Sequence, residues 1–429
     1  MELTKEEREM IEGKHGKTLA KVIRTVVEYG TLFGAKRLIP LDKPVHLVTS
    51  FGVSILKPVY NMMNELIENG LHTVLPFTVD PRPLDHKNIH YNLPERLVFK
   101  IMYGKQKYYE KQLMKIGLKD DNAFTCTCYH KEIGNIPEKG DILAWAESSA
   151  VVYANSVIGA RTNRNSAIID LFSGILGKTP EFGFLTNEGR KAKWLIELKT
   201  TELPPAQVLG STIGLKVIEE VPYIKGLDKF LKDRPQDDIN DYLKDMGAAS
   251  ASNGAVGLFH VENITPEAVD EGEKLLSRDF KMYSIDDAKI KQTRSSYPNM
   301  YKNPEANPRL CFIGCPHLSL QQLNKWTNEI SEALQKTGRR KIKIKTILTA
   351  APDVVRKFKE NKHQLMKLKK NLVRLSSVCP LMNMNNPLFS KKAVITNSNK
   401  LRMYSTAKYY DDHEILNLIT GGDKDEKRI

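Results

Sequence analysis

Two of the five cysteines in this chain of 429 residues occupy equivalent positions in its last third. Cys315 ends the stretch RLCFIGC and Cys379 ends LVRLSSVC, so each follows a predicted strand and stands directly before a proline. Because parallel strands end at the same edge of their sheet, we expect both thiols at that edge. Thiolates bind metal ions and iron–sulfur clusters. The matched positions therefore favour a metal site over a chance placement.

A second pair of cysteines, Cys126 and Cys128, lies in the stretch AFTCTCY. The stretch is strand-like, and successive side chains on a strand point to opposite faces, so only one of the two thiols can enter a given site. Cys311 falls inside the strand before Cys315 and is expected in the core. The count of five is odd and the spacings form no disulfide framework, which indicates reduced thiols that are available to metal.

Residues 141–164, DILAWAESSAVVYANSVIGARTNR, form an apolar, helix-like run that contains no lysine. Small polar residues interrupt this run, namely Ser148, Ser149, Asn155, Ser156, Thr162 and Asn163. Buried polar groups need hydrogen-bond partners. The run is therefore either a structural network or one wall of a site for a polar ligand.

The chain carries 65 Lys and Arg against 51 Asp and Glu, a formal net charge of +14. This excess favours an anionic partner: nucleic acid, a small phosphorylated acid or an acidic subunit. The basic residues concentrate in 339–345 and 356–374. Apolar residues recur at helical spacing in the second segment, so its lysines are expected on a solvated helix face. Phe358 is its only aromatic residue and lies on the apolar face, which argues against base stacking and so against nucleic acid.

The sequence shows no feature of a membrane or secreted protein. No apolar run approaches the roughly 20 residues that span a bilayer. The first residues, MELTKEEREMIEG, contain no hydrophobic secretory region. The sequence therefore predicts a cytoplasmic protein without a membrane partner.

Alternating strands and helices place these residues in an α/β fold. VHLVTSFGVS, a helix over 56–69 and HTVLPFTVDP form a βαβ unit, whose ligand-binding loops follow its strands. The last third alternates more regularly and is typical of a doubly wound sheet. GAASASNGAVG, within residues 203–287, predicts a turn or a close-packed segment. We expect an N-terminal and central α/β region over 1–300, a C-terminal α/β lobe over 301–420 and a charged tail over 421–429.

Four motifs resemble the aconitase X family, the divergent branch of the aconitase superfamily. They are GDILAWAESSAVVYANSVIGARTNR, GCPHLS, VCPL and ITNSNK, and the likeness extends over nearly the whole chain. The resemblance implies aconitase-like lobes of largely parallel sheets flanked by helices, with the active site at the carboxyl ends of the strands. It also implies that Cys126, Cys315 and Cys379 hold an iron–sulfur cluster, for which we expect [4Fe-4S]. Three cysteines also fit a [2Fe-2S] cluster or a mononuclear iron.

The resemblance also nominates residues that bind substrate. FGVS is similar to the family's Gly-Val-Ser turn, and VDP is similar to its Asn-Pro, with an aspartate in place of the asparagine. The residues implied are Gly52, Val53, Ser54, Asp80, Pro81, Ser148, Ser149 and Ser398. Arg161 is a further candidate, because a guanidinium binds a carboxylate or phosphate with two hydrogen bonds; a structural ion pair is the alternative. The loop NMNNP after Cys379 departs from the family's small apolar sequence.

Three cysteine ligands leave one iron of a cuboidal cluster without a protein ligand. In an aconitase-type dehydration this iron binds the substrate's hydroxyl as a Lewis acid, and a base removes a proton from the neighbouring carbon. In the family that base is a serine of a small swivelling domain, for which the chain has no room after its last motif. The resemblance therefore implies a heterodimer in which a small subunit carries the catalytic serine.

The expected reaction is the dehydration of (R)-5-phosphomevalonate to trans-anhydromevalonate 5-phosphate in the mevalonate pathway of isoprenoid biosynthesis. Its anionic substrate agrees with the basic composition. The alternative within the family is the dehydration of cis-3-hydroxy-L-proline, a zwitterion that needs no excess positive charge. A non-catalytic basic nucleic-acid-binding protein and an inactive homologue are the alternatives from other classes.

Overall fold

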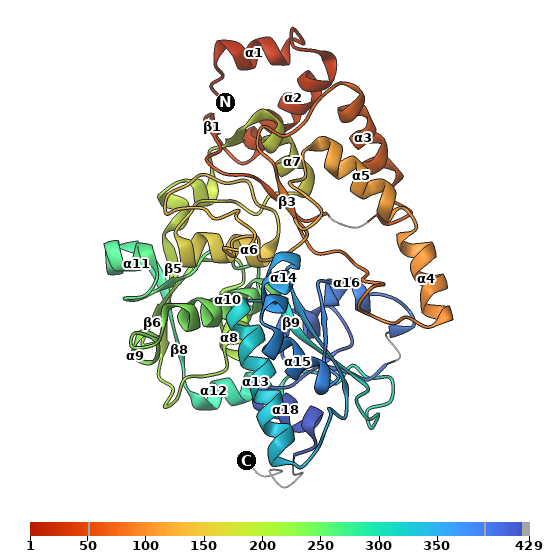
Figure 1. Ribbon diagram of the computed structural model, residues 1–429. Coiled ribbons are helices and arrows are strands. Elements are labelled where there is room, and N and C mark those ends of the chain that lie inside the picture. Colours follow the sequence, from red (N-terminus) through yellow and green to blue (C-terminus); the bar gives the residue numbers. More distant parts are fainter. Residues whose placement is uncertain (50–51, 390–391, 423–429) are drawn as a thin grey trace.

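The computed structural model describes residues 1–49, 52–389 and 392–422, which Figure 1 traces. Their strands form four sheets, two of them with two strands, one with four and one with five. Both larger sheets are parallel throughout. Helices flank them (Figure 1), which is the α/β class that the sequence predicts.

The red and orange part of the chain forms the upper lobe in Figure 1 together with residues 167–180. Its strands β2 (His46–Leu47) and β3 (Thr78–Val79) pair in parallel, as the βαβ interpretation predicts, but each is only two residues long. β1 (Leu38–Pro40) pairs antiparallel with β4 (Lys178–Pro180). The helices are α1 (Lys5–Ile11), α2 (Lys17–Leu32), α3 (Lys57–Glu68), α4 (Leu93–Tyr103), α5 (Gln106–Ile116) and α7 (Ala167–Leu176). Apolar faces of α2, α3, α5 and α7 close over the strands in one core.

Isolated bridges, rather than long strands, align the loops of this lobe. His46 pairs with Trp145, and Val79 pairs with Phe124. The two ends of the polar segment 141–164 are extended backbone held by such bridges. Between them lie a short helix, α6 (Ser148–Tyr153), and a π-helical turn, η1 (Ala154–Ile158). Only this middle part is helical, so the helix-like run that the sequence indicates is shorter than residues 141–164.

The central lobe holds the four-stranded sheet, in the order β7 (His260–Val261), β6 (Pro222–Lys225), β5 (Ala192–Leu198), β8 (Leu276–Ile285). Its helices are α8 (Ala206–Val217), α9 (Asp228–Leu231), α10 (Gln236–Asn253), α11 (Pro266–Glu271) and α12 (Asp287–Ser295). Short 3-10 turns are η2 (Gly183–Leu185), η3 (Glu188–Arg190) and η4 (Gly272–Leu275).

The small residues of GAASASNGAVG mostly belong to α10, and the chain leaves the helix only after Asn253. They allow α10 to lie directly against α8. A Cβ atom on Gly210 of α8 would come within 2.0 Å of the carbonyl oxygen of Met246 in α10. Close packing, one of the two readings of this motif, is therefore confirmed, because no larger side chain fits between the two helices.

The C-terminal lobe holds the five-stranded sheet, in the order β11 (Arg374–Ser376), β10 (Lys345–Ala350), β9 (Leu310–Leu318), β12 (Val394–Thr396), β13 (Lys408–Tyr409). Its helices are α13 (Leu320–Lys336), α14 (Pro352–Glu360), α15 (Lys362–Lys370), α16 (Pro380–Met384), α17 (Asn399–Met403) and α18 (Asp412–Thr420). One face packs against α13, α14, α15 and α18. The other face packs against α4 and α17, so a helix of the N-terminal region contributes to the C-terminal core.

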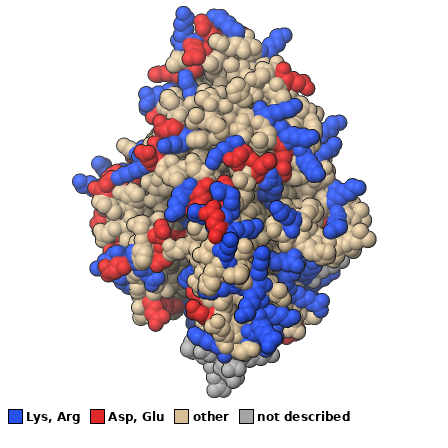
Figure 2. Space-filling view, in the orientation of Figure 1, with Lys and Arg blue, Asp and Glu red and all other residues tan. Residues whose placement is uncertain are grey.

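The Lys-rich segment forms two helices, α14 and α15, with Asn361 between them as the N-cap of the second. Figure 2 shows Lys and Arg gathered over the lower middle of the molecule, where Figure 1 places α13 and α15. Val355, Phe358 and Leu368 are buried beneath these helices, as the predicted amphipathic spacing requires. Much of the excess positive charge therefore lies on a solvated surface.

Two expectations about the whole chain are not decided by this architecture. The division near residue 300 stays a prediction, and most of the charged tail predicted over 421–429 lies outside the described residues. Within the described ranges, no helix is both long and apolar enough to cross a bilayer.

Candidate functional site

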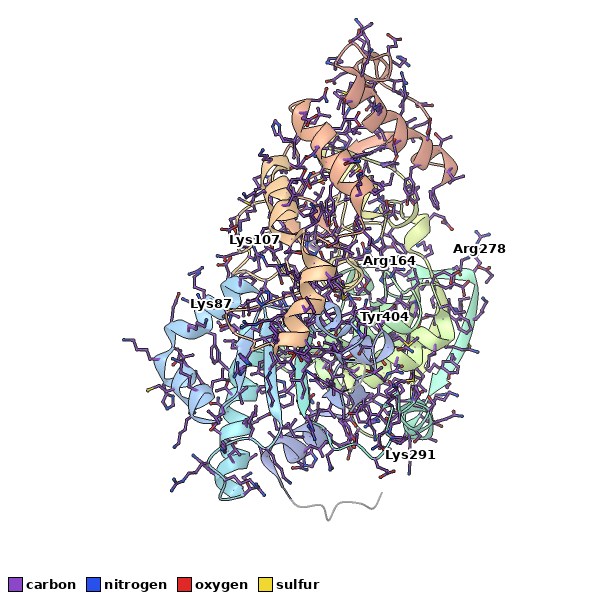
Figure 3. The ribbon with its side chains drawn as sticks, turned by 90° about the vertical axis from the view of Figure 1, so that its right-hand side faces the viewer. Lys87, Lys107, Arg164, Arg278, Lys291 and Tyr404 are labelled. Carbon is purple, nitrogen blue, oxygen red and sulfur yellow. The ribbon has the colours of Figure 1, made fainter. Side chains whose placement is uncertain are left out.

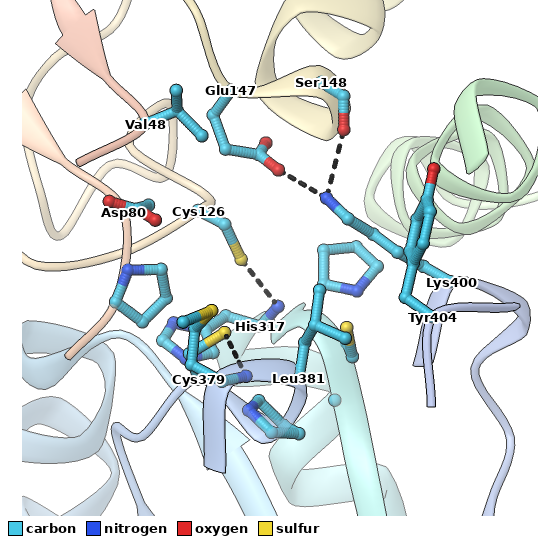
Figure 4. A pocket seen from close by; sticks show the side chains of 16 residues that line it. Val48, Asp80, Cys126, Glu147, Ser148, His317, Cys379, Leu381, Lys400 and Tyr404 are labelled. Atoms are coloured by element: carbon cyan, nitrogen blue, oxygen red, sulfur yellow. Dashed lines mark hydrogen bonds and ion pairs between the residues drawn. The ribbon is translucent and has the colours of Figure 1, made fainter. Parts of the chain in front are cut away.

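A cavity of about 310 Å³ lies where the upper lobe and α6 meet the carboxyl end of the five-stranded sheet (Figure 4). Tyr404 is 54% exposed and marks the mouth, near the middle of the face seen in Figure 3. The described residues that line the cavity are Val48, Asp80, Pro81, Cys126, Glu147, Ser148, Gly314, Cys315, Pro316, His317, Cys379, Pro380, Leu381, Met382, Lys400 and Tyr404.

The three cysteines nominated by resemblance all line this cavity. Cys126 lies two residues after the bridge of Phe124, in a bend rather than in the strand that the sequence predicts. Cys379 is the N-cap of α16, just beyond β11. Cys315 lies on β9, two strands away from β11 in the same parallel sheet. The predicted meeting of Cys315 and Cys379 at one edge is therefore confirmed.

The expectation that Cys315 follows the end of its strand needs a correction, because β9 continues to Leu318. Its pairing with β10 shifts register after Ile313, and Gly314 adopts a φ of +109°. A Cβ on Gly314 would lie 2.4 Å from the carbonyl oxygen of Thr349. Glycine therefore permits the distortion that turns the next residue, Cys315, towards the cavity.

Cys128 and Cys311 do not line the cavity in the described structure. Cys128 is fully buried in a cluster with Trp145 and Ala150, beside the segment that carries α6. Cys311 is fully buried in the core of the C-terminal lobe. Both expectations about these residues, one inward thiol from the C-x-C pair and a core position for Cys311, are confirmed.

The protein environment keeps the three cavity thiols protonated when nothing binds them. Burial raises the pKa of Cys126 well above its usual value, and the negative charge of Glu147 raises it further. Burial and the neighbouring Cys315 raise the pKa of Cys379. Burial also raises the pKa of Cys315, although the charge of Lys400 opposes this shift. A cationic group that binds all three sulfurs would replace their protons and remove the cost of the thiolate charges.

Backbone groups already point at two of the sulfurs. The His317 N–H donates to Cys126 Sγ at 3.3 Å, and the Met382 N–H donates to Cys379 Sγ at 3.5 Å (Figure 4). Hydrogen bonds to sulfur are a usual means by which proteins tune iron–sulfur clusters. The Ser398 hydroxyl donates to the carbonyl oxygen of Cys315 and so restrains the backbone that carries this third cysteine.

The arrangement of the three cysteines is compatible with a polynuclear cluster. Within the described ranges, no three His, Cys, Asp or Glu side chains are grouped closely enough to hold one metal ion. In a cuboidal cluster each cysteine binds a different iron, so its sulfurs stand farther apart than the ligands of one ion. Three cysteines around one cavity match that requirement.

Opposite the cysteines, Lys400 and Glu147 form an ion pair at 2.5 Å (Figure 4). The Lys400 ammonium also donates to the hydroxyl oxygen of Ser148 at 3.1 Å. Burial alone would lower the pKa of Lys400, but the charge of Glu147 raises it above its usual value. Burial acts to raise the pKa of Glu147, but Lys400, the Ser149 hydroxyl and the Ala150 N–H lower it overall. Both groups are therefore charged at neutral pH.

Three of the predicted substrate-binding residues, Asp80, Pro81 and Ser148, line the cavity. The Gly-Val-Ser turn does not. The Gly52 N–H donates to Gln106, and the Ser54 hydroxyl donates to the Ile101 carbonyl, so the turn packs against α4 and α5. The two residues before Gly52 lie outside the described ranges.

Ser149, Ser398 and Arg161 also stay outside the lining. The Ser149 hydroxyl donates to Glu147 at 2.7 Å, so it acts on the site through that carboxylate. Ser398 caps α17, the helix that carries Lys400. The Arg161 guanidinium donates to the Leu185 carbonyl at 3.3 Å and to the Asn187 side chain at 2.6 Å, which is a structural role.

The polar segment serves mainly as a structural network. The Asn155 side chain donates to the carbonyls of Thr162 and Gly257 and accepts from the Thr162 N–H. The Ser156 hydroxyl accepts from the Phe259 N–H at 2.9 Å. Of the small polar residues in this segment only Ser148 lines the cavity, so the network reading holds for most of the segment.

Glu147, Lys400, His317 and Tyr404 line the cavity without having been predicted. Glu147 stands directly before Ser148, and Lys400 follows Ser398 by two residues, so the motifs pointed to the right loops. In so basic a chain, however, the sequence position of a lysine or glutamate in the site does not distinguish it from the many solvated ones. Its burial in the structure is what distinguishes it.

Comparison with known proteins finds members of one family. A family model described as the aconitase X first domain matches residues 1–188, and one described as the aconitase X second domain matches residues 192–295. The phosphomevalonate dehydratase large subunit of Thermococcus kodakarensis is 31% identical over 82% of this chain and 81% of its own length. Its namesake from Methanosarcina mazei is 35% identical over 76% and 75%.

A more distant relative, the cis-3-hydroxy-L-proline dehydratase of Pseudomonas aeruginosa, is 25% identical over 92% of this chain and 65% of its own length. Among solved structures, the holo-form of aconitase X from Thermococcus kodakaraensis superposes with a TM-score of 0.79 at 27% identity. The superposition covers 97% of this chain and 99% of that one.

Proposed function

This chain belongs to the aconitase X family, whose curated relatives are named as dehydratases, and from that premise we propose that it is the large subunit of an iron–sulfur hydro-lyase. The proposed reaction is the dehydration of (R)-5-phosphomevalonate to trans-anhydromevalonate 5-phosphate. The observation that supports it most directly is the meeting of Cys126, Cys315 and Cys379 around one cavity that also holds a buried ion pair.

A [4Fe-4S] cluster is the cofactor proposed for the three thiols. When bound, it supplies an iron without a protein ligand, which polarises a hydroxyl so that it can leave as hydroxide. The fit rests on the donor set, because three sulfurs of distant loops surround one cavity. This chain's own part in the chemistry is to hold that cofactor and to orient the substrate against it.

Lys400 is the residue best placed to orient the substrate. An ammonium group has three N–H donors, and Glu147 and Ser148 accept two of them. Within the part of the chain that the structure describes these are its two acceptors, so the third N–H is proposed to donate to an acidic group of a ligand in the cavity, and this charge-assisted bond fixes the ligand's orientation. Glu147 keeps the ammonium in place, and Ser149 and the Ala150 N–H hold Glu147 in turn.

A small subunit is the proposed partner, and it would carry the serine that removes the proton. Relatives of this chain bear the name of a large subunit, which implies a smaller one. Among the described lining residues, Lys400 and Glu147 neutralise each other and the thiols belong to the cofactor, so none of these groups is proposed as the base. The base is therefore expected to reach the cavity through its open mouth at Tyr404.

The choice of substrate rests on the relatives rather than on charge. Curated relatives named phosphomevalonate dehydratase large subunit are 30 to 35% identical, against 25% for the hydroxyproline dehydratases. Among the described residues that line the cavity, Asp80 and Glu147 are acidic and Lys400 is the basic one with an ammonium group. cis-3-Hydroxy-L-proline therefore stays as the alternative, because a zwitterion suits such a mixed lining. A nucleic-acid-binding protein needs no such cavity.

The test is anaerobic purification of the chain with its small subunit, followed by iron and sulfide analysis and by NMR detection of product from each substrate. The proposal requires the alkene product from phosphomevalonate. Cys126→Ser should abolish turnover, whereas Cys128→Ser, its matched neighbour outside the cavity, should retain it. A cluster-bearing complex that converts only hydroxyproline would replace the substrate, and equal loss in both cysteine variants would contradict the assigned ligand set.

A further inference from the structure

The loops that carry the three cysteines are joined with a fourth loop in a closed ring of hydrogen bonds. The Thr125 N–H donates to the Val79 carbonyl at 2.7 Å, which fixes the Cys126 loop beside Asp80. On the other side, the Cys379 N–H donates to the Arg82 carbonyl at 2.8 Å, which fixes the Cys379 loop beside Pro81. These two links do not include the Cys315 loop, which lies between the Cys126 loop and the Cys379 loop in the ring.

The His317 side chain makes both of the missing links. Its Nδ1 lies 3.1 Å from the Thr125 hydroxyl, one residue before Cys126. Its Nε2 lies 3.3 Å from the Val378 carbonyl, one residue before Cys379. His317 itself stands two residues after Cys315. One fully buried imidazole thus touches the residue before each of two cysteines and belongs to the loop of the third.

The chemistry of the partners assigns the protons. A carbonyl oxygen can only accept, so Nε2 carries the hydrogen and donates to Val378. Nδ1 then accepts, and the Thr125 hydroxyl donates to it. The Thr125 oxygen keeps its lone pairs for the Thr127 N–H, which lies 3.0 Å away. Every contact in the ring is therefore satisfied by neutral groups in one arrangement.

The backbone of His317 acts on the site as well. Its N–H donates to Cys126 Sγ at 3.3 Å, and its carbonyl accepts from the Lys244 ammonium at 3.3 Å. Lys244 is 1% exposed and is also held by Gln322 and Asp241. These contacts hold the peptide groups on both sides of His317, so neither peptide can rotate without losing one of them. The imidazole links and the peptide contacts together leave His317 little freedom.

We infer that His317 is a positioning residue that sets the relative placement of Cys126, Cys315 and Cys379, so that all three sulfurs can bind one cluster. This inference rests on the proposed function. It adds that the spacing of the sulfurs depends on one side chain outside the ligand set. A cluster with three protein ligands is sensitive to such spacing, because the loss of one ligand exposes its iron to chelators and oxygen.

A buried histidine that merely fills the core would affect stability and nothing else. Four variants separate the two roles. His317→Gln retains a donor for Val378, His317→Asn retains an acceptor for Thr125, and His317→Ala retains neither. Thr125→Val removes the same link from the other side, with little change of volume. His260→Gln is the matched control, because His260 is likewise buried, at 1% exposed, and its Nε2 likewise contacts a carbonyl, that of Arg190 at 2.9 Å, away from the cavity.

The experiment uses the anaerobically purified complex. It measures iron and sulfide per chain, the electron paramagnetic resonance spectrum of the reduced cluster, the rate of iron loss to a chelator and the thermal midpoint. We expect iron loss to be at least tenfold faster in His317→Ala, about threefold faster in His317→Gln, His317→Asn and Thr125→Val, and unchanged in His260→Gln. If His317→Ala does not fold, the three milder variants decide the question. Wild-type spectra and iron-loss rates in folded His317 variants would overturn the inference.

A wild-type complex that binds no iron and sulfide would instead overturn the proposed function. The positioning claim can then be read from the apo chain by mass spectrometry of alkylated thiols. Cys126 and Cys379 should react several times faster in His317→Ala than in the wild type, while Cys128 serves as the internal reference. Equal alkylation rates in the two proteins would overturn the positioning claim in that case.

Discussion

Lys400 Nζ lies 2.5 Å from Glu147 Oε1, although the two residues are 253 positions apart in the chain. Their side chains are 13% and 5% exposed. The pair joins α17 of the C-terminal lobe to the N-cap of α6. A buried ion pair is costly to desolvate, and its retention beside a cavity favours a role in binding over a role in stability alone.

Lys400→Met should abolish turnover and also destabilise the chain. The substitution leaves the Glu147 carboxylate buried without its cation, which costs about 3–5 kcal/mol in comparable pairs. The measurements are turnover of the complex and the free energy of unfolding from denaturant titration.

The double variant Lys400→Met, Glu147→Gln is its control, because it removes both charges. It should recover most of the lost stability and none of the activity. Recovered activity in the double variant would show that Lys400 is needed only as a partner for Glu147.

Gly314→Ala should disturb the site through the backbone of β9. Gly314 has a φ of +109°, and an added Cβ would lie 2.4 Å from the Thr349 carbonyl oxygen. Strain of this kind costs about 1–3 kcal/mol. We expect a lower thermal midpoint and a lower iron content, because Cys315 is the next residue. Gly272→Ala is the control, since Gly272 also has a positive φ, of +53°, but no atom within 4 Å of the added Cβ. An equal effect of both variants on iron content would contradict the local explanation.

The sequence predicted which cysteines lie around one cavity better than it predicted the loops beside them. Cys315 and Cys379 were recognisable because each follows a strand-like stretch and precedes a proline, whereas Cys126 was nominated by the family resemblance. Gly52, Val53 and Ser54 were nominated by the same resemblance, yet they pack against α4 and α5. The path of a loop depends on the helices that it packs against, and short motifs carry no information about those contacts.

Long-range pairing explains the other differences. Segment 141–164 is apolar enough for one helix, but bridges from Trp145 to His46 and to Arg164 draw its ends into extended backbone. Tertiary pairing overrides local propensity in such cases. The regular last third was easier to predict, because strands of parallel sheets and the helices between them have distinct hydrophobic periods.

Arg161→Gln should have little effect on substrate binding, contrary to the clamp that the sequence suggested. The guanidinium donates to the Leu185 carbonyl and to Asn187, outside the cavity lining. Loss of these hydrogen bonds costs about 1 kcal/mol each. We expect a lower thermal midpoint with KM unchanged within about twofold. A tenfold rise in KM with unchanged stability would restore Arg161 to the binding site.

Asp170→Asn should make the stability of the upper lobe less dependent on pH. Burial raises the pKa of Asp170 in α7 to about 8, and only one of its oxygens accepts a hydrogen bond from Asn165, at 2.9 Å. The folded chain therefore binds a proton that the unfolded chain releases above its ordinary pKa of 3.8. This proton's contribution to the free energy of unfolding is complete below the unfolded pKa and is lost as the pH rises towards about 8.

The asparagine of Asp170→Asn keeps the acceptor for Asn165 and cannot ionise. The variant should thus gain about 1–3 kcal/mol over the wild type at alkaline pH and little near pH 4. Denaturant titrations at the two pH values measure the difference, and a gain of equal size at both would mean that Asp170 is ionised in the folded chain.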